Sequence, residues 1–434
     1  MYYQPELETM PRAELEALQL ERLQKLAGYV YDRIPFYKEA FDEAGVSPAD
    51  IKSLDDLQKL PFTTKQDLRD AYPFKMFAVP QSEVTRIHCS SGTTGTATVV
   101  GYTEKDLEVW GDCFARFLYA ADCGPDSVLQ VAYGYGLFTG GLGAHQGGER
   151  GGLTVLPMSS GNTKRQVRLM HDFGVDVLAC TPSYALNIAE VAYDEGYDPR
   201  EFKIHAGILG AEPCSESMRA EIQDKLGIQV FDIYGLSEVM GPGVACECDQ
   251  QNGLHVCEDH FIIEIVDPQT LEPVPDGEWG EVVFTTLSKQ CSPLIRYRTR
   301  DISRIVTGQC KCGRTFRRMD RITGRTDDMM ILRGVNVFPS QIEEEIVSFP
   351  EIVSQYQLIL TTRGALDHVE LQVETVPDFP FDEVARLQKL KKDLEKALKD
   401  NLQIAVEVKI VEPKTIERSE GKAKRIIDLR EGLK

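Results

Sequence analysis

The chain has 434 residues, of which 42% are hydrophobic and 27% charged, a composition typical of a globular protein with two or three domains. Its formal net charge of -20 argues against a nucleic-acid-binding role, because a phosphate backbone needs a basic surface. A single nucleotide remains compatible with this charge, since a few local hydrogen-bond donors are enough to bind it.

Neither an export signal nor a membrane span is expected. The first ten residues contain no basic stretch followed by an apolar run. The longest uncharged stretch, residues 127–148, holds seven glycines and therefore does not predict a transmembrane helix. Eleven cysteines, an odd number, favour free thiols or metal ligands in a reducing compartment. We therefore expect a cytoplasmic protein.

Hydrophobic periodicity predicts an α/β fold over the first part of the chain. Leucines at helical spacing indicate a helix within residues 12–45. Further on, short apolar runs alternate with amphipathic segments, which predicts a large domain with a mostly parallel sheet. The runs are residues 128–132, 153–156, 175–179 and 206–209, and the amphipathic segments are 163–173 and 214–226. Residues 260–310 resemble antiparallel strands joined by turns at 267–268 and 276–277.

A smaller α+β domain is expected after residue 326, so that the predicted domains are residues 1–326 and 327–434. Residues 329–332 have the pattern of a strand, and residues 369–373 alternate like a half-buried one. Ser340 and Glu343 have capping-box spacing before an apolar-periodic helix. Residues 381–402 predict a charged amphipathic helix.

A segment rich in glycine and hydroxyl groups is the strongest local motif. It consists of Ser90, Ser91, Gly92, Thr93, Thr94 and Gly95. The glycines allow the backbone to approach a polyphosphate, and the hydroxyls add hydrogen-bond donors. It is not a Walker loop, because no Lys-Ser/Thr pair follows the second glycine. Taken alone, it fits a polar surface turn as well as a phosphate loop.

Further blocks follow in a fixed order. They are Gly210, Ala211, Glu212 and Pro213, then residues 234–238, 298–301, 324–339 and 419–425. In this order and spacing the six blocks resemble the adenylate-forming superfamily of acyl-CoA synthetases, peptide-synthetase adenylation domains and luciferases. Residues 34–37, 60–63 and 132–136 are similar to those of phenylacetate–coenzyme A ligases in particular. The resemblance covers the whole chain.

The resemblance implies an ATP site. Residues 90–95 would hold the β- and γ-phosphates, and Glu238 would help to hold Mg²⁺, which prefers oxygen ligands. Asp301 would accept hydrogen bonds from both ribose hydroxyls. The adenine would lie between Tyr234, followed by Gly235, and residues 211–213, with Asp232 near its exocyclic amine. Arg325 would meet the phosphate or the ribose.

The resemblance also implies two successive poses of a mobile C-terminal domain. Lys422, in a Gly-Lys-x-x-Arg context, would be catalytic because its ammonium can reach the acid and the α-phosphate together. Asp327 would be the hinge residue. In the second pose, the loop that begins at Gly334 would line a coenzyme A channel. The simpler interpretations are a solvated lysine and an acidic linker. The chain departs from many superfamily members in having Thr96, where they carry a lysine directly after the phosphate loop.

A loop rich in aromatic residues and glycines is the candidate acyl pocket. Tyr133, Tyr135, Gly136 and Phe138 combine flat apolar walls with room for a planar acid. Ordinary core packing is the alternative interpretation. By resemblance, the substrate is phenylacetate or a hydroxylated or indolic relative.

Two short Cys/His clusters predict a structural zinc site. The first contains Cys246, Cys248, His255 and Cys257, and the second Cys310 and Cys312. A tetrahedral site needs four ligands, and we select Cys248, His255, Cys310 and Cys312. Cys246 and Cys257 remain the alternatives. Four ligands would close the site, so that zinc would stabilise structure and not take part in chemistry.

The main prediction is therefore an enzyme that activates an aromatic acid with ATP and transfers the acyl group to coenzyme A. The expected cofactors are ATP, Mg²⁺, coenzyme A and zinc, and a homodimer is left open. An adenylating enzyme that passes the acyl group to a carrier protein or an amine would share every ATP block. A non-catalytic sensor and a zinc-dependent nucleic-acid module are disfavoured by the intact motifs and by the net charge, respectively.

Overall fold

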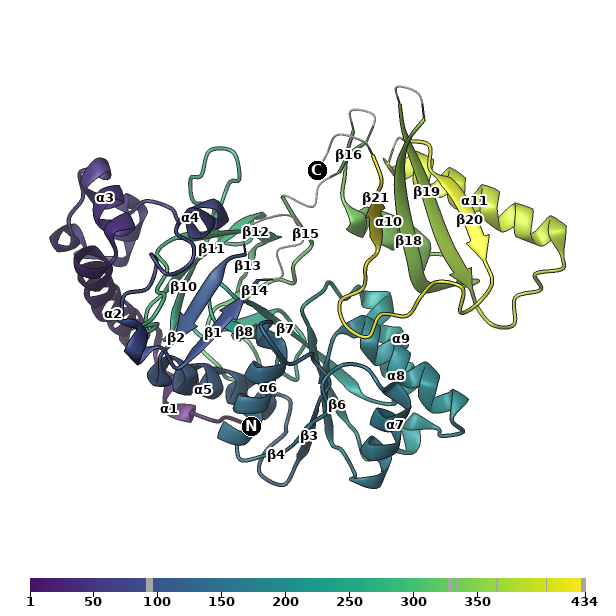
Figure 1. Ribbon diagram of the computed structural model, residues 1–434, viewed down its shortest axis with the longest axis horizontal. Coiled ribbons are helices and arrows are strands. Elements are labelled where there is room, and N and C mark those ends of the chain that lie inside the picture. Colours follow the sequence, from purple (N-terminus) through teal and green to yellow (C-terminus); the bar gives the residue numbers. More distant parts are fainter. Residues whose placement is uncertain (91–96, 327–329, 333–334, 364–365, 403, 431–434) are drawn as a thin grey trace.

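The computed structural model describes residues 1–90, 97–326, 330–332, 335–363, 366–402 and 404–430 (Figure 1). A large body contains all the helices and strands up to residue 325, and a smaller one contains those from residue 330 onward. Each body has a hydrophobic core of its own. Among the described residues, no helix has the length and apolar character needed to cross a bilayer.

A nine-stranded mixed sheet forms the centre of the large body, in the order β13-β14-β9-β8-β7-β6-β5-β3-β4. Its parallel part is β3 (Val128–Val131), β4 (Thr154–Pro157), β5 (Val177–Cys180), β6 (Ala206–Gly210) and β7 (Gln229–Leu236). The antiparallel part is β8 (Gly241–Cys246), β9 (Leu254–Val256), β13 (Ile305–Val306) and β14 (Arg318–Met319). The four apolar runs therefore form parallel strands, as their pattern predicts.

Helices pack on this sheet, and all but the first of them connect its parallel strands. They are α5 (Glu104–Ala120), α6 (Thr139–Arg150), α7 (Thr163–Asp172), α8 (Pro182–Asp194) and α9 (Glu216–Leu226), with a short 3₁₀ turn η4 (Pro199–Glu201) after α8. Helices α8 and α9 begin directly after a residue whose hydroxyl caps the first turn. The Thr181 hydroxyl accepts the Tyr184 N–H at the start of α8, and Ser215 does the same for Met218 at the start of α9.

The predicted antiparallel region is confirmed as a second sheet, in the order β10-β11-β12-β15. Its strands are β10 (Phe261–Val266), β11 (Gly280–Thr286), β12 (Tyr297–Ser303) and β15 (Gly324–Arg325). A two-stranded ribbon, β1 (Arg86–Cys89) with β2 (Val99–Tyr102), flanks the phosphate-loop segment. Residues 91–96 of that segment lie outside the described residues.

The helical structure predicted for residues 12–45 is confirmed, and it is divided into two helices. After α1 (Pro5–Glu8), α2 (Arg12–Arg33) ends at Ile34, and α3 (Pro35–Ala44) begins at once. Ile34 has an extended backbone because a residue before proline is pushed out of the helical region. Shorter elements follow: η1 (Pro48–Asp50), η2 (Leu54–Lys59), α4 (Lys65–Asp70) and η3 (Gln81–Glu83).

The small body has a four-stranded sheet, in the order β20-β19-β18-β21. Its elements are β18 (Ile352–Arg363), β19 (Leu366–Thr375), β20 (Glu407–Val411), β21 (Ile426–Asp428), α10 (Pro339–Val347) and α11 (Val384–Leu402), with a ribbon of β16 (Met330–Leu332) and β17 (Val335–Val337). The predicted helix cap is wrong. The helix begins at Pro339, and the Gln341 side chain accepts the Phe338 N–H, so that Ser340 lies inside the first turn.

Candidate active site

Three segments meet at the carboxyl ends of neighbouring parallel strands. Residues 181–183 follow β5, residues 211–213 follow β6, and residues 234–238 complete and follow β7. Carboxyl ends of parallel strands share one edge of a sheet, and this edge is where α/β proteins bind ligands. Ala211 has a φ of +72°, a left-handed conformation that is costly for a residue with a side chain and that concentrates at functional sites.

Two glycines of these motifs are required by close packing. A Cβ on Gly210 would lie 2.6 Å from the Ile233 carbonyl oxygen, and a Cβ on Gly235 would lie 1.8 Å from the Gly241 carbonyl oxygen. Both residues therefore permit the close approach of β6, β7 and β8. Their presence in the motifs has a structural cause in addition to any contact with a nucleotide.

Asp301, the expected ribose-binding residue, is held from two sides. The Tyr234 hydroxyl donates to Asp301 Oδ2 at 2.5 Å, and the Arg325 guanidinium donates to Oδ1 at 3.1 Å. β12 pairs with β15 so that Asp301 and Arg325 are direct neighbours. Burial raises the pKa of Tyr234, which keeps this phenol neutral and able to donate. The structure therefore brings these three candidate residues together.

Glu238 lies next to Thr98, which in turn lies beside Ser90, the first residue of the phosphate-loop segment. Its carboxylate receives a hydrogen bond from the Thr98 hydroxyl at 3.3 Å, and the Ser90 hydroxyl lies 2.5 Å from the Thr98 hydroxyl oxygen, which can accept its proton. The Lys65 ammonium lies 3.4 Å from Glu238 Oε1. Other candidate residues lie outside the described residues. They are Ser91, Gly92, Thr93, Thr94, Gly95, Asp327 and Gly334.

The loop that carries Lys422 is docked against the large body on both sides of the lysine. The Gly421 carbonyl accepts hydrogen bonds from the hydroxyls of Thr181 at 2.9 Å and Ser183 at 3.2 Å. The Ala423 N–H donates to Glu212 Oε2 at 2.8 Å, while Glu212 Oε1 accepts the Ser183 N–H at 2.7 Å. Lys422 itself is exposed at the edge where the parallel strands end. Glu212 uses both oxygens to hold protein backbone.

Arg418 bridges the two bodies a few residues earlier. Its guanidinium donates to Glu374 on β19 at 2.8 and 2.9 Å, and to Glu190 on α8 at 2.9 and 3.2 Å. Glu374 has a fully buried carboxylate that also accepts the N–H groups of Lys414 and Ile416. Residues 414–418 are thus held by hydrogen bonds to Glu374 of the small body, and Arg418 also binds Glu190 of the large body.

Asp232 lies on β7, next to Glu247, whose carboxylate accepts the Asp232 N–H at 2.9 Å. Burial, followed by repulsion from the Glu247 carboxylate, raises the pKa of Asp232 to about 8. At neutral pH this side chain is therefore mainly protonated. Its expected contact with an adenine amine would then come from the carbonyl oxygen of a neutral carboxyl group.

Replacing Asp232 with asparagine is expected to change how stability depends on pH. The folded chain keeps a proton on Asp232 that the unfolded chain loses above about pH 4, so this group favours folding most at low pH and progressively less up to pH 8. The thermal midpoint of Asp232→Asn should therefore rise relative to that of wild type between pH 5 and pH 8. Parallel pH curves for the two proteins would show that Asp232 is ionised throughout.

The candidate acyl pocket lies between β3 and α6. Tyr133 is buried, and Tyr135 is half-buried with its hydroxyl 3.1 Å from His145 Nδ1 on α6. Gly136 has a φ of +142°, which only glycine adopts without strain. Phe138, 41% exposed, immediately precedes α6. The four predicted pocket residues therefore form one turn at the carboxyl end of β3, on the same edge of the sheet as the nucleotide motifs.

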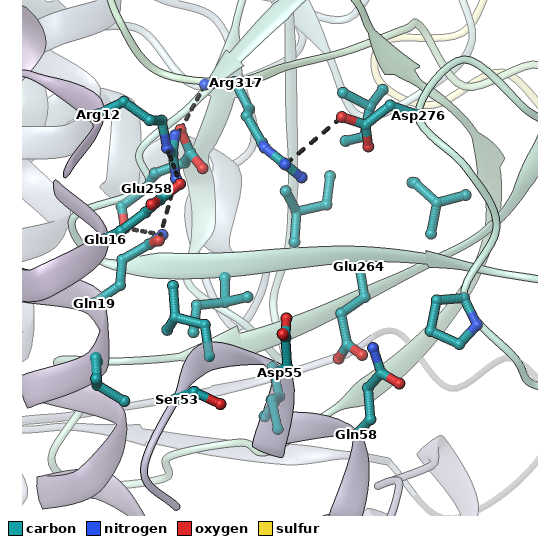
Figure 2. Close-up of a pocket in the computed structure, with 18 of the residues that line it drawn as sticks. Arg12, Glu16, Gln19, Ser53, Asp55, Gln58, Glu258, Glu264, Asp276 and Arg317 are labelled. Atoms are coloured by element: carbon teal, nitrogen blue, oxygen red, sulfur yellow. Dashed lines mark hydrogen bonds and ion pairs between the residues drawn. The ribbon is translucent and has the colours of Figure 1, made fainter.

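A separate pocket of about 610 Å³ lies between α2, η2 and β10 (Figure 2). Its charged side chains are largely paired with one another: Arg12 with Glu258, and Arg317 with Asp276. None of the motif residues lines it. We therefore assign no step of the chemistry to this pocket.

Comparisons with known proteins agree with the motif order. Residues 14–288 match the model of the AMP-binding enzyme family, and residues 334–430 match that of the AMP-binding enzyme C-terminal domain. Phenylacetate-coenzyme A ligase of Thermus thermophilus is 50% identical over 99% of this chain and 100% of that protein. Its counterpart from Escherichia coli is 51% identical over 98% of this chain and 97% of that protein. The chain belongs to the phenylacetate-coenzyme A ligase family. The family expected from the six ordered blocks is therefore confirmed.

Solved structures of another adenylate-forming ligase indicate which pose of this family the chain adopts. 2-Hydroxyisobutyryl-CoA ligase in its postadenylation state, in complex with 2-HIB-AMP, superimposes with a TM-score of 0.92 at 30% identity, covering 98% of this chain and 92% of that one. The same ligase in its thioesterification state gives a TM-score of 0.73 at 31% identity, with the same coverage. The expected two-part α/β fold is confirmed, and the arrangement of its parts is more similar to that of the first of these structures than to that of the second. The docked Lys422 loop is consistent with this arrangement.

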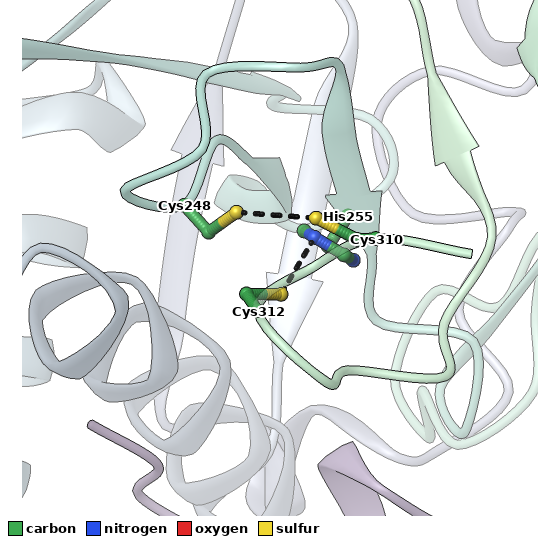
Figure 3. Close-up of side chains that lie close together, drawn as sticks. All are labelled: Cys248, His255, Cys310 and Cys312. Atoms are coloured by element: carbon green, nitrogen blue, oxygen red, sulfur yellow. Dashed lines mark hydrogen bonds between the residues drawn. The ribbon is translucent and has the colours of Figure 1, made fainter. Parts of the chain in front are cut away.

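The four residues that we selected for zinc lie together. The ligand atoms of Cys248, His255, Cys310 and Cys312 all lie within 4.8 Å of one another, and Figure 3 shows the four side chains pointing toward a common centre. Cys248 Sγ is 3.6 Å from Cys310 Sγ, and Cys312 Sγ is 3.4 Å from His255 Nε2. His255 lies on β9, which pairs with β14, and the Cys310–Cys312 loop connects β13 to β14.

Sequence reasoning missed the residues that hold the Lys422 loop and the lysine that meets Glu238. Thr181 and Ser183 carried a usable signal, because they directly follow the buried strand β5 at the same sheet edge as the recognised motifs. Lys65 and Arg418 carried none, since charged residues are common and the partners of these two lie far away in the sequence.

Proposed function

We propose that this chain converts phenylacetate, ATP and coenzyme A into phenylacetyl-coenzyme A, AMP and pyrophosphate. Two findings support this reaction. The relatives named phenylacetate-coenzyme A ligase are about half identical to it over nearly their whole length. In addition, the Lys422 loop is hydrogen-bonded at the sheet edge that also carries Glu238 and Tyr234, whose hydroxyl donates to Asp301. The second finding carries the proposal, because the backbone on both sides of Lys422 is bound at this edge and its ammonium would lie near the expected reaction centre.

The proposed reaction has two displacements. First, a carboxylate oxygen of the acid attacks the α-phosphorus of ATP, and the bond to the pyrophosphate oxygen breaks. Lys422 would hold the two anions together and offset the charge that builds up on the α-phosphate oxygens. Next, the thiolate sulfur of coenzyme A attacks the acyl carbonyl carbon, and AMP leaves. Asp301, held by Tyr234 and Arg325, would keep the ribose in place during both steps.

Glu238 fits a Mg²⁺ site, because its side chain is 7% exposed and presents a carboxylate next to the hydroxyl of Thr98. Mg²⁺ bound there would neutralise part of the charge on the phosphate oxygens. We propose the same nucleotide contacts for residues 90–95, 210–213, Tyr234 and Gly235 as the family resemblance implies. Glu212 is the exception, since its carboxylate is engaged with Ser183 and Ala423.

We also propose that residues 1–326 and 327–434 act as two domains with Asp327 as the hinge. Their separate hydrophobic cores, together with the different TM-scores to the two states of 2-hydroxyisobutyryl-CoA ligase, support this division. In the second pose, the loop beginning at Gly334 would line the coenzyme A channel. A reducing, cytoplasmic location is proposed because all eleven cysteines are free.

Zinc is proposed as a structural cofactor. Three thiols and one imidazole are a donor set typical of structural zinc, and a closed set of four leaves no position for a substrate. Zinc there would tie the loop after β8 to β9 and to the β13–β14 hairpin. Elemental analysis of protein purified without added metal should find about one zinc per chain.

The enzymatic proposal is tested with a panel of acids. Phenylacetate, 4-hydroxyphenylacetate, indole-3-acetate, benzoate and 2-hydroxyisobutyrate are each supplied with Mg-ATP, with and without coenzyme A, while pyrophosphate and thioester are measured. Phenylacetate should give the highest kcat/KM and a thioester, because two tyrosines and glycines form the pocket turn. Pyrophosphate without thioester would indicate a carrier protein or an amine as the acceptor. No pyrophosphate with any acid would overturn the proposal.

A further inference from the structure

Lys65 meets the carboxylate that the proposed function assigns to Mg²⁺. Its ammonium lies 3.4 Å from Glu238 Oε1. The Glu238 side chain is 7% exposed, whereas the Lys65 side chain is 39% exposed. The pair therefore lies at a rim, with a buried anion inside and a cation reaching in from solvent. A lysine in this position can contact Glu238 and a ligand beside it.

The backbone that carries Lys65 is fixed to the sheet that carries Asp301. Thr63 forms a parallel bridge with Tyr297 on β12, donating its N–H to the Arg296 carbonyl at 3.1 Å and accepting the Arg298 N–H at 2.9 Å. Its hydroxyl is buried and donates to the Ile295 carbonyl at 2.7 Å. Residues 60–63, which distinguish this family in the sequence, thereby hold the following segment on β12.

Thr64 completes this anchor. Its side chain and the Asp67 carboxylate cap the start of α4 reciprocally, with the Thr64 N–H donating to Asp67 Oδ2 at 2.7 Å. The main chain on either side of Lys65 is thus fixed, and only its side chain is free to move. A flexible ammonium on a rigid base is suited to meet a phosphate group that arrives and leaves.

A second lysine near Glu238 has a different environment. Lys289 is 2% exposed, and its ammonium donates to the carbonyls of Glu238 at 3.0 Å and Val239 at 2.9 Å. It also lies over the Tyr102 ring. Lys289 therefore binds the backbone at Glu238 and Val239 from the buried side and is unavailable to a ligand. Lys65, on the solvent side, remains accessible to one.

We propose that Lys65 binds the β- and γ-phosphates of Mg-ATP and supplies the positive charge that many superfamily members obtain from a lysine after the phosphate loop. This inference rests on the proposed function. The chain has Thr96 at that position in the sequence, and the tetraanionic nucleotide still requires a cation as pyrophosphate departs. The positions of Ser90 and Thr98 beside Glu238 place Lys65 at the phosphate end of the site.

A purely structural role predicts the opposite effect. If Lys65 only neutralises Glu238, it competes with Mg²⁺ for that carboxylate. Its removal would then leave Mg-ATP binding unchanged or make it tighter. If Lys65 binds phosphate, its removal weakens Mg-ATP binding but leaves the binding of AMP unchanged, because AMP has no β- or γ-phosphate.

The test is calorimetric titration of Mg-ATP and of AMP into the full chain without any acid substrate, so that no turnover occurs. Lys65→Met should weaken Mg-ATP binding by about 10-fold to 100-fold, the range of one charge-assisted hydrogen bond, and leave AMP binding unchanged. Lys65→Arg should keep most of the affinity. Lys75→Met, an exposed lysine in the same N-terminal region, is the matched control and should bind like wild type.

A rescue experiment gives a second, independent readout. Adding Thr96→Lys to Lys65→Met should restore most of the Mg-ATP affinity, because either lysine can supply the charge. Equal Mg-ATP affinity of wild type and Lys65→Met, or an equal loss of AMP binding, would overturn the inference. If wild type itself binds no Mg-ATP, the proposed function fails instead, so that the two failures are distinguishable.

Discussion

Lys422→Ala should lower the rate of acyl-adenylate formation by about 10³-fold, while thioester formation from a supplied acyl-adenylate is largely retained. The loop on which Lys422 sits is held at Gly421 and Ala423, so alanine removes the charge and leaves the loop docked. Adenylation brings two anions together and depends on that charge. The second displacement would occur after AMP has become a leaving group, when, in the proposed second pose, the small domain has moved Lys422 away.

Two separate assays check this expectation. Pyrophosphate release from phenylacetate and Mg-ATP measures the first displacement, and thioester absorbance with synthetic phenylacetyl-adenylate and coenzyme A measures the second. Lys424→Ala is the matched control, because Lys424 is also exposed, lies two residues away and should be dispensable. Equal losses in both assays, or the same loss in the control, would remove Lys422 from the proposed role.

Cys310→Ser is expected to release the bound zinc and to lower the thermal midpoint by about 5 °C or more, because the folding free energy of a structural zinc site comes largely from the metal. A serine hydroxyl is a poor ligand for zinc in a set of thiols and imidazole. Cys310 belongs to the loop between β13 and β14, which contains no helix or strand that could hold it in place. Loss of the metal should therefore loosen this edge of the nine-stranded sheet.

Cys257→Ser provides the control for burial. Cys257 is 2% exposed and Cys310 is 6% exposed, so both substitutions place a hydroxyl in a buried position. Only Cys310 belongs to the cluster of four ligand atoms. We expect Cys257→Ser to keep about one zinc per chain and Cys310→Ser to keep none. Retention of zinc by Cys310→Ser would show that Cys310 is not a ligand.

The elements that could be predicted from the sequence are those whose cause is local. The parallel strands β5 and β6 are continuous apolar runs, and such runs form strands whose two faces are both covered. The break between α2 and α3 also had a local cause in Pro35, which the leucine spacing concealed. The start of α10 at Pro339 also has a local cause. Proline is favoured at the first helical position, so the helix begins there and the following serine is not the cap.

The remaining parts of the site depend on contacts between distant segments. The Gly421 carbonyl meets Thr181 and Ser183 about 240 residues away, and no pattern in either segment points to the other. The proposed zinc ligands lie on two hairpins that the pairing of β9 with β14 brings together. The sequence could therefore propose six ligands but had no physical basis for excluding Cys246 and Cys257, whose positions only the packed sheet determines.

The ion pairs of Arg418 with both bodies affect how the turnover rate should depend on ionic strength. In the proposed second pose, Arg418 would keep Glu374, which belongs to the same domain, but it would have to leave Glu190 on the large one. The proposed rotation would therefore separate opposite charges, together with those of Lys414 and Asp194. Because dissolved ions screen such pairs, we expect higher ionic strength to favour the rotated pose and to lower the barrier between the two displacements. The turnover rate should then depend on the salt content of the surroundings, even for a substrate whose own chemistry does not change with salt.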